Sequence, residues 1–177
     1  LLEASGKPEE AANVAQKWVK EHPKDGVVRG YLANLSLVKR DYKSAAAQYR
    51  GIIEKDPSNV SALNNLAWSL SELEDPQAKE IAERAYKLAP ANPSVVNTYG
   101  WVLVKQGDTA RGIEVLRKSV ELDPDDAGRR LYLARALITS GDKPEARKQL
   151  EIVARADPAK PDSAKARAQA EELMKSL

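Results

Sequence analysis

The sequence predicts an all-α fold built from repeated pairs of antiparallel helices. A phrase of large and small residues recurs about every 34 residues, for example Leu66-Ala67 and Tyr99-Gly100. A proline closes each copy, and a short polar joint divides each copy into two helical stretches. Self-similarity at this period is typical of helical arrays in which each unit buries its apolar face against the next one.

The closing prolines set the expected boundaries, because proline lacks an N–H and restricts the residue before it. The closing prolines are Pro23, Pro57, Pro90, Pro124 and Pro158. We expect one array over residues 1–177, with a partial repeat at 1–25, full repeats at 26–59, 60–92, 93–126 and 127–160, and a capping helix at 161–177. Since residue 1 would lie inside a first helix, we also expect earlier repeats in a longer protein.

Small residues mark where the two helices of each unit approach one another. In the first helices they are Ala33, Ala67, Gly100 and Ala134, and in the second helices Ala11, Ala45, Ala78, Gly112 and Ala146. Helices pack about 8–10 Å apart, and small side chains permit the shorter distances. The joints, such as Gly107-Asp108 and Gly141-Asp142, combine a residue suited to a left-handed cap with one that starts a helix.

This pattern resembles the tetratricopeptide repeat (TPR) family from Ser5 to Pro158. The resemblance implies a right-handed α-solenoid whose first helices line a concave groove. Arg29 and Arg130 depart from it, since the family prefers a large apolar residue at that early site. Trp18 lies late in a second helix, at a site the family buries, so we expect it in the core.

Composition argues against several kinds of function. The net charge is +2, which gives no basic field for nucleic acid, and no stretch approaches the roughly 20 apolar residues of a membrane span. The chain has no cysteine and only one histidine, His22, so zinc constellations and Cys–His catalysis are excluded. Phosphate-binding glycine loops are missing as well. We predict no catalytic site, no metal, no cofactor and no enzymatic activity.

The resemblance places three positions of each first helix in the groove. The predicted partner-binding residues are Tyr31, Asn34, Asn64, Asn65, Trp68, Asn97, Thr98, Trp101, Tyr132 and Arg135. Trp68 and Trp101 are one repeat apart, so we expect them to project in parallel, with Asn64 and Asn97 one turn before them. Amides and indoles suit an extended peptide or a glycan. Alternatively, both tryptophans only fill the space between first helices.

A narrower resemblance concerns the runs Ala62 to Trp68 and Thr98 to Leu103. They are similar to the C-terminal repeats of bacterial TPR lipoproteins associated with exosortase (PEP-CTERM) systems and exopolysaccharide production. This implies a periplasmic or outer-membrane-attached scaffold that binds a protein segment during export or sorting; a cytoplasmic location is the alternative. Two other functions stay open: direct binding of a polysaccharide in the groove, and regulation as one part of a larger enzyme.

Overall fold

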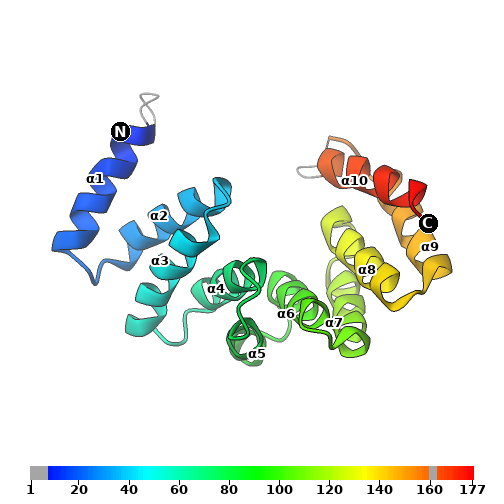
Figure 1. The fold of residues 1–177 in the computed structure, drawn as a ribbon, viewed down its shortest axis with the longest axis horizontal. Helices are drawn as coiled ribbons and strands as arrows, with labels where there is room; N and C mark the ends of the chain where they lie inside the picture. Colours follow the sequence, from blue (N-terminus) through cyan, green and yellow to red (C-terminus); the bar gives the residue numbers. More distant parts are fainter. Residues whose placement is uncertain (1–7, 160–162) are drawn as a thin grey trace. The chain divides into compact units, whose positions relative to one another are not determined.

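The computed structural model describes residues 8–159 and 163–177, and these form helices without any strand. The helices are α1 (Pro8–Glu21), α2 (Gly26–Val38), α3 (Tyr42–Lys55), α4 (Val60–Glu72), α5 (Ala78–Leu88), α6 (Pro93–Lys105), α7 (Thr109–Leu122), α8 (Ala127–Ser140), α9 (Lys143–Ala154) and α10 (Ser163–Lys175) (Figure 1). The all-α fold class is therefore confirmed. In the part of the chain described, none of these helices is both apolar and long enough to cross a bilayer.

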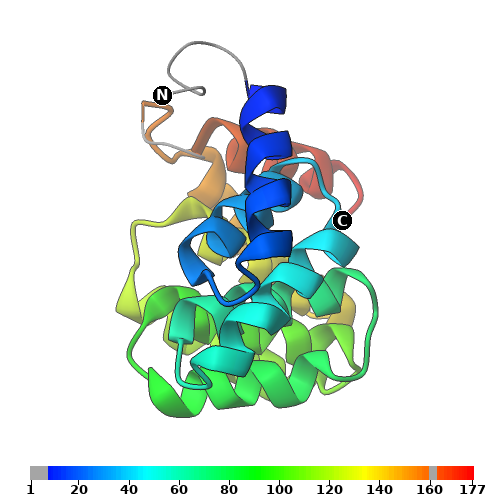
Figure 2. The same cartoon turned by 90° about the vertical axis from the view of Figure 1, so that its left-hand side faces the viewer.

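The helices group into two compact units, residues 1–88 and 89–177. In the first unit α1 packs on α2, α2 pairs with α3, α3 packs on α4, and α4 pairs with α5 (Figures 1 and 2). In the second unit α6 pairs with α7 and α8 with α9, while α7 packs on α8. Consecutive helices thus form hairpins in each unit. That one array of repeats runs through both units stays a prediction.

Helix α10 covers the end of the last hairpin in the second unit. Its buried residues Ala166 and Ala170 belong to one apolar cluster with Leu150 and Val153 of α9. Ala134 of α8 joins the same cluster. The predicted C-terminal capping helix therefore has a packing role, since without it these side chains would face water.

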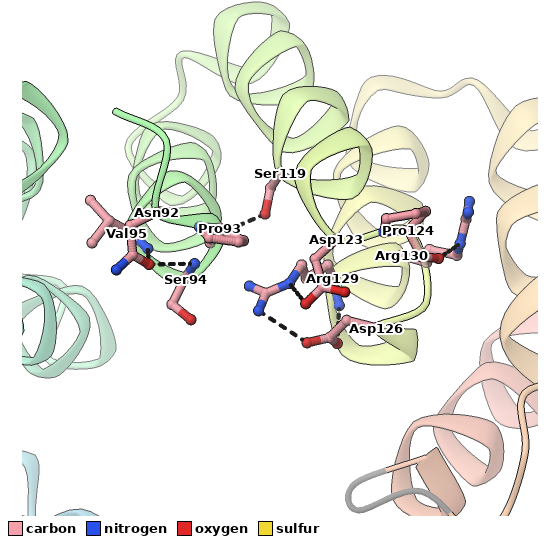
Figure 3. A network of polar contacts seen from close by, with 10 residues as sticks. All are labelled: Asn92, Pro93, Ser94, Val95, Ser119, Asp123, Pro124, Asp126, Arg129 and Arg130. Atoms are coloured by element: carbon pink, nitrogen blue, oxygen red, sulfur yellow. Dashed lines mark hydrogen bonds and ion pairs between the residues drawn. The ribbon is translucent and has the colours of Figure 1, made fainter. Parts of the chain in front are cut away.

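Side-chain caps start most of the helices. Asp25 Oδ1 accepts from the backbone N–H groups of Val27 and Val28 at the start of α2. In the second unit Asn92 caps α6 in the same way, through Ser94 and Val95 (Figure 3). These bonds satisfy N–H groups that have no partner inside the helix. These two caps lie at the turns after closing prolines, while Asp41 and Asp142 cap α3 and α9 at joints inside the hairpins.

The joints inside the hairpins share one backbone conformation. Gly107 and Gly141 have φ values of 87° and 85°, as a left-handed helix end requires. Arg40 and Glu74 take the same left-handed region, with φ of 56° and 57°, although they carry a β-carbon. The hairpin turn is thus conserved within the molecule even where the sequence lacks the expected glycine.

Helices α6 and α7 approach closely at two glycines. A β-carbon on Gly112 would lie 2.5 Å from Val104 Cγ2 and 2.9 Å from the carbonyl oxygen of Gly100. A β-carbon on Gly100 would lie 2.8 Å from Leu116 Cγ. Only residues without a side chain fit both positions, which explains why glycine replaces alanine in this repeat.

Arg29 and Arg130, which depart from the family pattern, make the same pair of hydrogen bonds in their two units. Arg29 donates from Nε to the carbonyl oxygen of Pro23 at 2.8 Å and from Nη1 to Gln48 Oε1 at 2.9 Å. Arg130 donates from Nε to the Pro124 carbonyl oxygen at 3.0 Å (Figure 3). It also donates from Nη1 to Gln149 Oε1 at 3.2 Å. Each guanidinium therefore joins a closing proline to the following second helix.

The prediction that Trp18 is a core residue is wrong. Its side chain is 44% exposed, stacks on His22 with ring centroids 3.9 Å apart, and donates from Nε1 to Asp25 Oδ2 at 2.9 Å. The core of this region is formed instead by Ala15 and Val19 of α1. The indole has a polar partner at the turn after α1, so it lies across the surface rather than inward.

Candidate functional site

The predicted groove residues all lie on the first helices of the hairpins, α2, α4, α6 and α8. Because α2 and α4 belong to the first unit and α6 and α8 to the second, each unit presents its own part of the candidate site. The parallel arrangement of Trp68 and Trp101 involves both units and stays a prediction.

In the first unit, three of the predicted asparagines belong to one chain of hydrogen bonds. Asn64 donates from Nδ2 to Asn65 Oδ1 at 3.2 Å, and Asn65 donates from Nδ2 to the Tyr49 hydroxyl at 3.1 Å. Tyr49 in turn donates to Asn34 Oδ1 at 2.8 Å. The chain runs from α4 through α3 to α2, so a second helix holds the amides of two first helices in fixed orientations.

Tyr49 is the centre of this chain, and the sequence did not single it out as a functional residue. Its side chain is only 3% exposed. Burial raises the pKa of the Tyr49 hydroxyl, and the hydrogen bond from Asn65 opposes that rise. At the corresponding positions the second helices α5 and α7 carry the apolar residues Ala82 and Leu116. The hydroxyl of Tyr49 at an otherwise apolar position is the feature of the sequence that could have indicated a role.

The chain leaves one exposed donor and one buried acceptor in the first unit. Asn34 is exposed, and its carbonyl oxygen is already used by Tyr49, so its Nδ2 group is oriented as a donor. Asn64 Oδ1 is buried and has no hydrogen-bond partner among the described residues. A buried acceptor without a donor costs about 1–3 kcal/mol, so a donor supplied by a partner would be favourable here.

Tyr31 and Trp68 complete the predicted set in the first unit. Tyr31 is half-buried and packs against the cluster formed by Ala15, Val19 and Leu32. Trp68 is half-buried on α4, between the buried residues Ala67 and Ser69 of the same helix. Both aromatic residues thus keep some exposed surface.

In the second unit, the structure brings three predicted residues into contact. The rings of Trp101 on α6 and Tyr132 on α8 have centroids 5.1 Å apart and are tilted by 57°. The Arg135 guanidinium lies 5.9 Å from the centre of the Tyr132 ring. An aromatic pair with this spacing and tilt is favourable, and a guanidinium near a ring face adds a cation–π attraction.

A residue outside the prediction fixes the arginine. Gln169 on α10 accepts at Oε1 from Arg135 Nη2 at 3.1 Å. Arg135 forms no salt bridge with any described carboxylate, so its positive charge is not neutralised within the second unit. Gln169 lies 34 residues after Arg135, about one repeat further along, but on a helix for which the sequence predicted only a capping role.

The remaining two predicted residues lie deeper in α6. Asn97 is half-buried, and its Oδ1 has no hydrogen-bond partner in the part of the chain described. Asn64 occupies the corresponding position of α4, and its Oδ1 likewise has no hydrogen-bond partner among the described residues. Thr98 is 6% exposed, so its side chain is buried beneath the helix surface.

The site offers binding groups rather than reactive ones. Its side chains are amides, phenols, indoles and one guanidinium, which donate or accept hydrogen bonds and present aromatic faces. The structure brings no three His, Cys, Asp or Glu side chains together as a metal site among the residues it describes. The arrangement can therefore recognise peptide groups, apolar side chains, hydroxyls and a carboxylate.

Models of the tetratricopeptide repeat match most of the sequence. One matches residues 1–60 and 65–127, a second matches residues 48–80, and a third matches residues 103–170. The matched segments cover helices of both units.

Similar proteins are found in bacteria. The TPR repeat-containing protein PA4667 of Pseudomonas aeruginosa is 27% identical over 126 residues, which cover 70% of this chain and 21% of that protein. Cellulose synthase 2 operon protein C of Komagataeibacter xylinus is 31% identical over 126 residues, which cover 68% of this chain and 10% of that protein. The chain thus spans about a fifth or less of the length of these relatives.

Solved structures share the fold. The TPR protein TTC0263 of Thermus thermophilus has a TM-score of 0.73 at 21% identity, covering 97% of this chain and 94% of that one. MamA of Desulfovibrio magneticus has a TM-score of 0.71 at 19% identity, covering 99% and 90%. YrrB, described as a TPR protein with an unusual peptide-binding site, has a TM-score of 0.69 at 17% identity, covering 99% and 87%.

Proposed function

Since this chain belongs to the tetratricopeptide repeat family, we propose that it is a non-catalytic scaffold that binds an extended segment of a partner protein. The binding surface is the groove side of the first helices, α2 and α4 in one unit and α6 and α8 in the other. Proteins of this family commonly act as interaction scaffolds, and the similar protein YrrB is described as having a peptide-binding site. The specific residues below make the proposal testable.

The observation that carries the proposal is the contact among Trp101, Tyr132 and Arg135 in the second unit. Aromatic residues and arginine are the types that dominate binding energy at protein interfaces. The indole and phenol provide a partly exposed apolar wall, while Arg135 is held beside it by Gln169. A partner segment that carries an apolar side chain next to a carboxylate or carbonyl group could pack against the aromatic wall and bond to Arg135 at the same time.

The hydrogen-bond chain of the first unit supports the same function. Tyr49 and Asn65 fix the amide of Asn34, so that its Nδ2 group can donate to a peptide carbonyl. Fixed groups bind at lower entropic cost than mobile ones, which favours recognition of an extended backbone.

We place this scaffold in bacterial export or sorting, as part of the assembly of an exopolysaccharide or of secreted proteins. The similarity to cellulose synthase 2 operon protein C supports this setting, as does the resemblance of residues 62–68 and 98–103 to exosortase-associated proteins. The relatives are much longer than this chain, so the proposal concerns this segment and its partner.

Direct binding of a polysaccharide is the second candidate. Its support is the combination of half-buried indoles with amides on the same helices, at Trp68 with Asn64 and at Trp101 with Asn97. Aromatic faces stack on sugar rings, while amides bond to hydroxyls. The 57° tilt between Trp101 and Tyr132 forms a wedge rather than a flat platform, and this favours a protein side chain.

The test uses the three tryptophans of the chain. In a Trp18→Phe background, indole fluorescence comes only from Trp68 and Trp101. Peptides selected from a random twelve-residue display library against this protein are titrated into it, and soluble cellulose oligosaccharides are titrated in parallel. The proposal expects peptide to shift the emission and oligosaccharide to leave it unchanged.

Two variants complete the test. Trp101→Ala combined with Arg135→Ala should weaken peptide binding by about 2–4 kcal/mol, or roughly 30- to 1000-fold, as for interface hot spots. Trp18→Phe is the matched control, because the polar and ring contacts of Trp18 are with His22 and Asp25, neither of which is a predicted groove residue, and it should leave affinity unchanged. Equal affinity of the double variant and the control would reject the groove assignment.

A further inference from the structure

We propose a second binding site in the first unit, formed by residues of α2, α3 and α5 and specific for a polyvalent oxyanion of the phosphate class. It is an open hollow of about 610 Å³ whose lining includes Arg29, Arg50, Gly51, Glu54, Pro57 and Arg84, here called the arginine hollow. The residues come from α2, α3, α5 and the turn after α3. None of them belongs to the predicted groove.

The charges in the hollow are only partly balanced. Arg29 and Arg84 form no salt bridge with any described residue; both donate to neutral carbonyl oxygens instead. Arg50 lies 3.7 Å from Asp75 in a pair that is largely exposed, with half of the arginine side chain accessible. Glu54 lines the hollow but pairs with none of the three arginines. The hollow thus has an excess of positive charge.

The arginines are also held in place, which distinguishes the hollow from a loose set of surface charges. Arg29 is fixed by the Pro23 carbonyl and by Gln48, and Arg84 Nη2 donates to the Pro57 carbonyl oxygen at 3.3 Å. Each of these bonds uses part of a guanidinium that carries five N–H donors, so further donors remain for a ligand. A fixed guanidinium loses little entropy when it binds an anion.

Gly51 provides the space for this arrangement. A β-carbon there would lie 2.7 Å from Arg29 Cζ and 2.8 Å from Arg29 Nε, so the guanidinium lies directly over the glycine. A side chain at this position would require the Arg29 guanidinium to shift within the hollow. The opening therefore depends on one residue that carries no charge itself.

The second unit supplies an internal comparison. Arg130 and Gln149 repeat the bond of Arg29 and Gln48, yet Ile152 stands where Gly51 stands in the first unit. Glu151 likewise takes the place of Arg50. The structural bond is thus present in both units, while the glycine and the additional cation occur only in the first one.

The geometry points to a phosphate-type group rather than a single carboxylate. Guanidinium groups converge on the hollow from three helices, and a tetrahedral anion offers oxygens in several directions at once. Guanidinium matches phosphate geometry well, and an open, solvated hollow favours a ligand with more than one negative charge. Such a group could be a free polyphosphate or a phosphate carried on a peptide.

Sodium pyrophosphate is titrated into ¹⁵N-labelled protein at low ionic strength, with sodium chloride at matched ionic strength as reference. We expect amide shifts confined to residues around Gly51, Pro57 and Arg84. Arg50→Gln with Arg84→Gln should weaken binding about tenfold or more, a change of about 1.4 kcal/mol or more. Arg117→Gln removes an exposed charge from a second helix of the other unit and should change affinity less than about twofold.

Gly51→Ala separates geometry from charge, because it leaves every arginine in the sequence and raises helix propensity. It should weaken pyrophosphate binding while circular dichroism and the melting temperature show an intact fold. A doubly phosphorylated peptide tests whether the hollow binds phosphate carried on a peptide, and a hexaglutamate peptide tests whether it binds carboxylates instead. Binding of the phosphopeptide would assign a carried phosphate, whereas tighter binding of hexaglutamate, unchanged affinity in Gly51→Ala, or no shifts at the hollow would overturn the proposal.

Discussion

Arg29 and Arg130 make the same pair of hydrogen bonds in the two units of the molecule, each to the closing proline of the preceding repeat and to a glutamine on the following helix. In the repeats between them the corresponding residues are Leu63 and Val96, which are fully buried. The arginines thus replace apolar packing with polar bonds at the first and the last full repeat of the expected array.

Arg130→Ala should therefore lower the free energy of unfolding by about 1–2 kcal/mol, since it removes bonds donated by a charged group. Arg147→Ala is the matched control, because Arg147 is an exposed helix residue and its removal should change stability by less than about 0.5 kcal/mol. Urea denaturation measures both values. Equal stabilities of the two variants would show that the bonds to Pro124 and Gln149 contribute nothing.

These arginines illustrate how far the sequence determines the fold. The prolines, small residues and polar joints predicted the helix hairpins, because they end helices, start them or permit their close approach in the same way in every repeat. The prediction for Trp18 was wrong because the position of its indole depends on a hydrogen bond to Asp25, which lies outside the helix that carries Trp18. Packing that depends on such single side-chain contacts is not encoded in the repeat.

In the candidate site, too, the repeat predicts the positions of residues but not the contacts between their side chains. The positions of Trp101, Tyr132 and Arg135 on first helices follow from the repeat register, but their mutual contacts depend on rotamers and on Gln169 of α10. The hydrogen-bond chain in the first unit depends on Tyr49, which replaces an apolar residue of the repeat. Neither Gln169 nor Tyr49 could be assigned from the repeat alone.

Tyr49→Phe tests the role of this tyrosine. The change keeps the buried ring but leaves Asn34 Oδ1 and the Asn65 amide without their shared partner, so stability should fall by about 1 kcal/mol. A double-mutant cycle with Asn65→Ala should give a coupling energy of about 0.5 kcal/mol or more. Strict additivity of the two changes would show that the bond between them is not significant.

Gly112→Ala tests the close approach of α6 and α7. The new methyl group would overlap Val104 and the Gly100 carbonyl, and overpacking of this kind costs about 1–3 kcal/mol. Gly30→Ala is the control, because no atom lies within 4 Å of its β-carbon position in α2. It should instead stabilise the protein by up to about 1 kcal/mol through helix propensity. Thermal melts that ranked the two variants in the opposite order would contradict this account.

The caps predict a loss of stability in acid. Hydrogen bonds from the Ser44 hydroxyl and backbone N–H lower the pKa of Asp41 below its ordinary value of 3.8, and the cap of α2 similarly lowers the pKa of Asp25. A carboxyl with a lower pKa in the folded state stabilises the protein above pH 3.8, and this contribution is lost as the pH falls through the folded-state pKa.

Asp41→Asn keeps a good capping residue but removes the titrating group. The variant should match the parent protein near pH 7 and lose less stability than the parent between pH 4 and the acid limit of the fold, as measured by urea midpoints. If both proteins lost stability equally on acidification, the cap at Asp41 would not contribute to the pH dependence.

The central claim is that a partner segment binds along the first helices, and amide shift mapping tests it most directly. A peptide selected against the Trp18→Phe protein is titrated into its ¹⁵N-labelled form. The account predicts that the largest shifts, including the indole N–H signals of Trp68 and Trp101, fall on α2, α4, α6 and α8. Shifts confined to the second helices α3, α5, α7 and α9, with both indole signals unchanged, would contradict it.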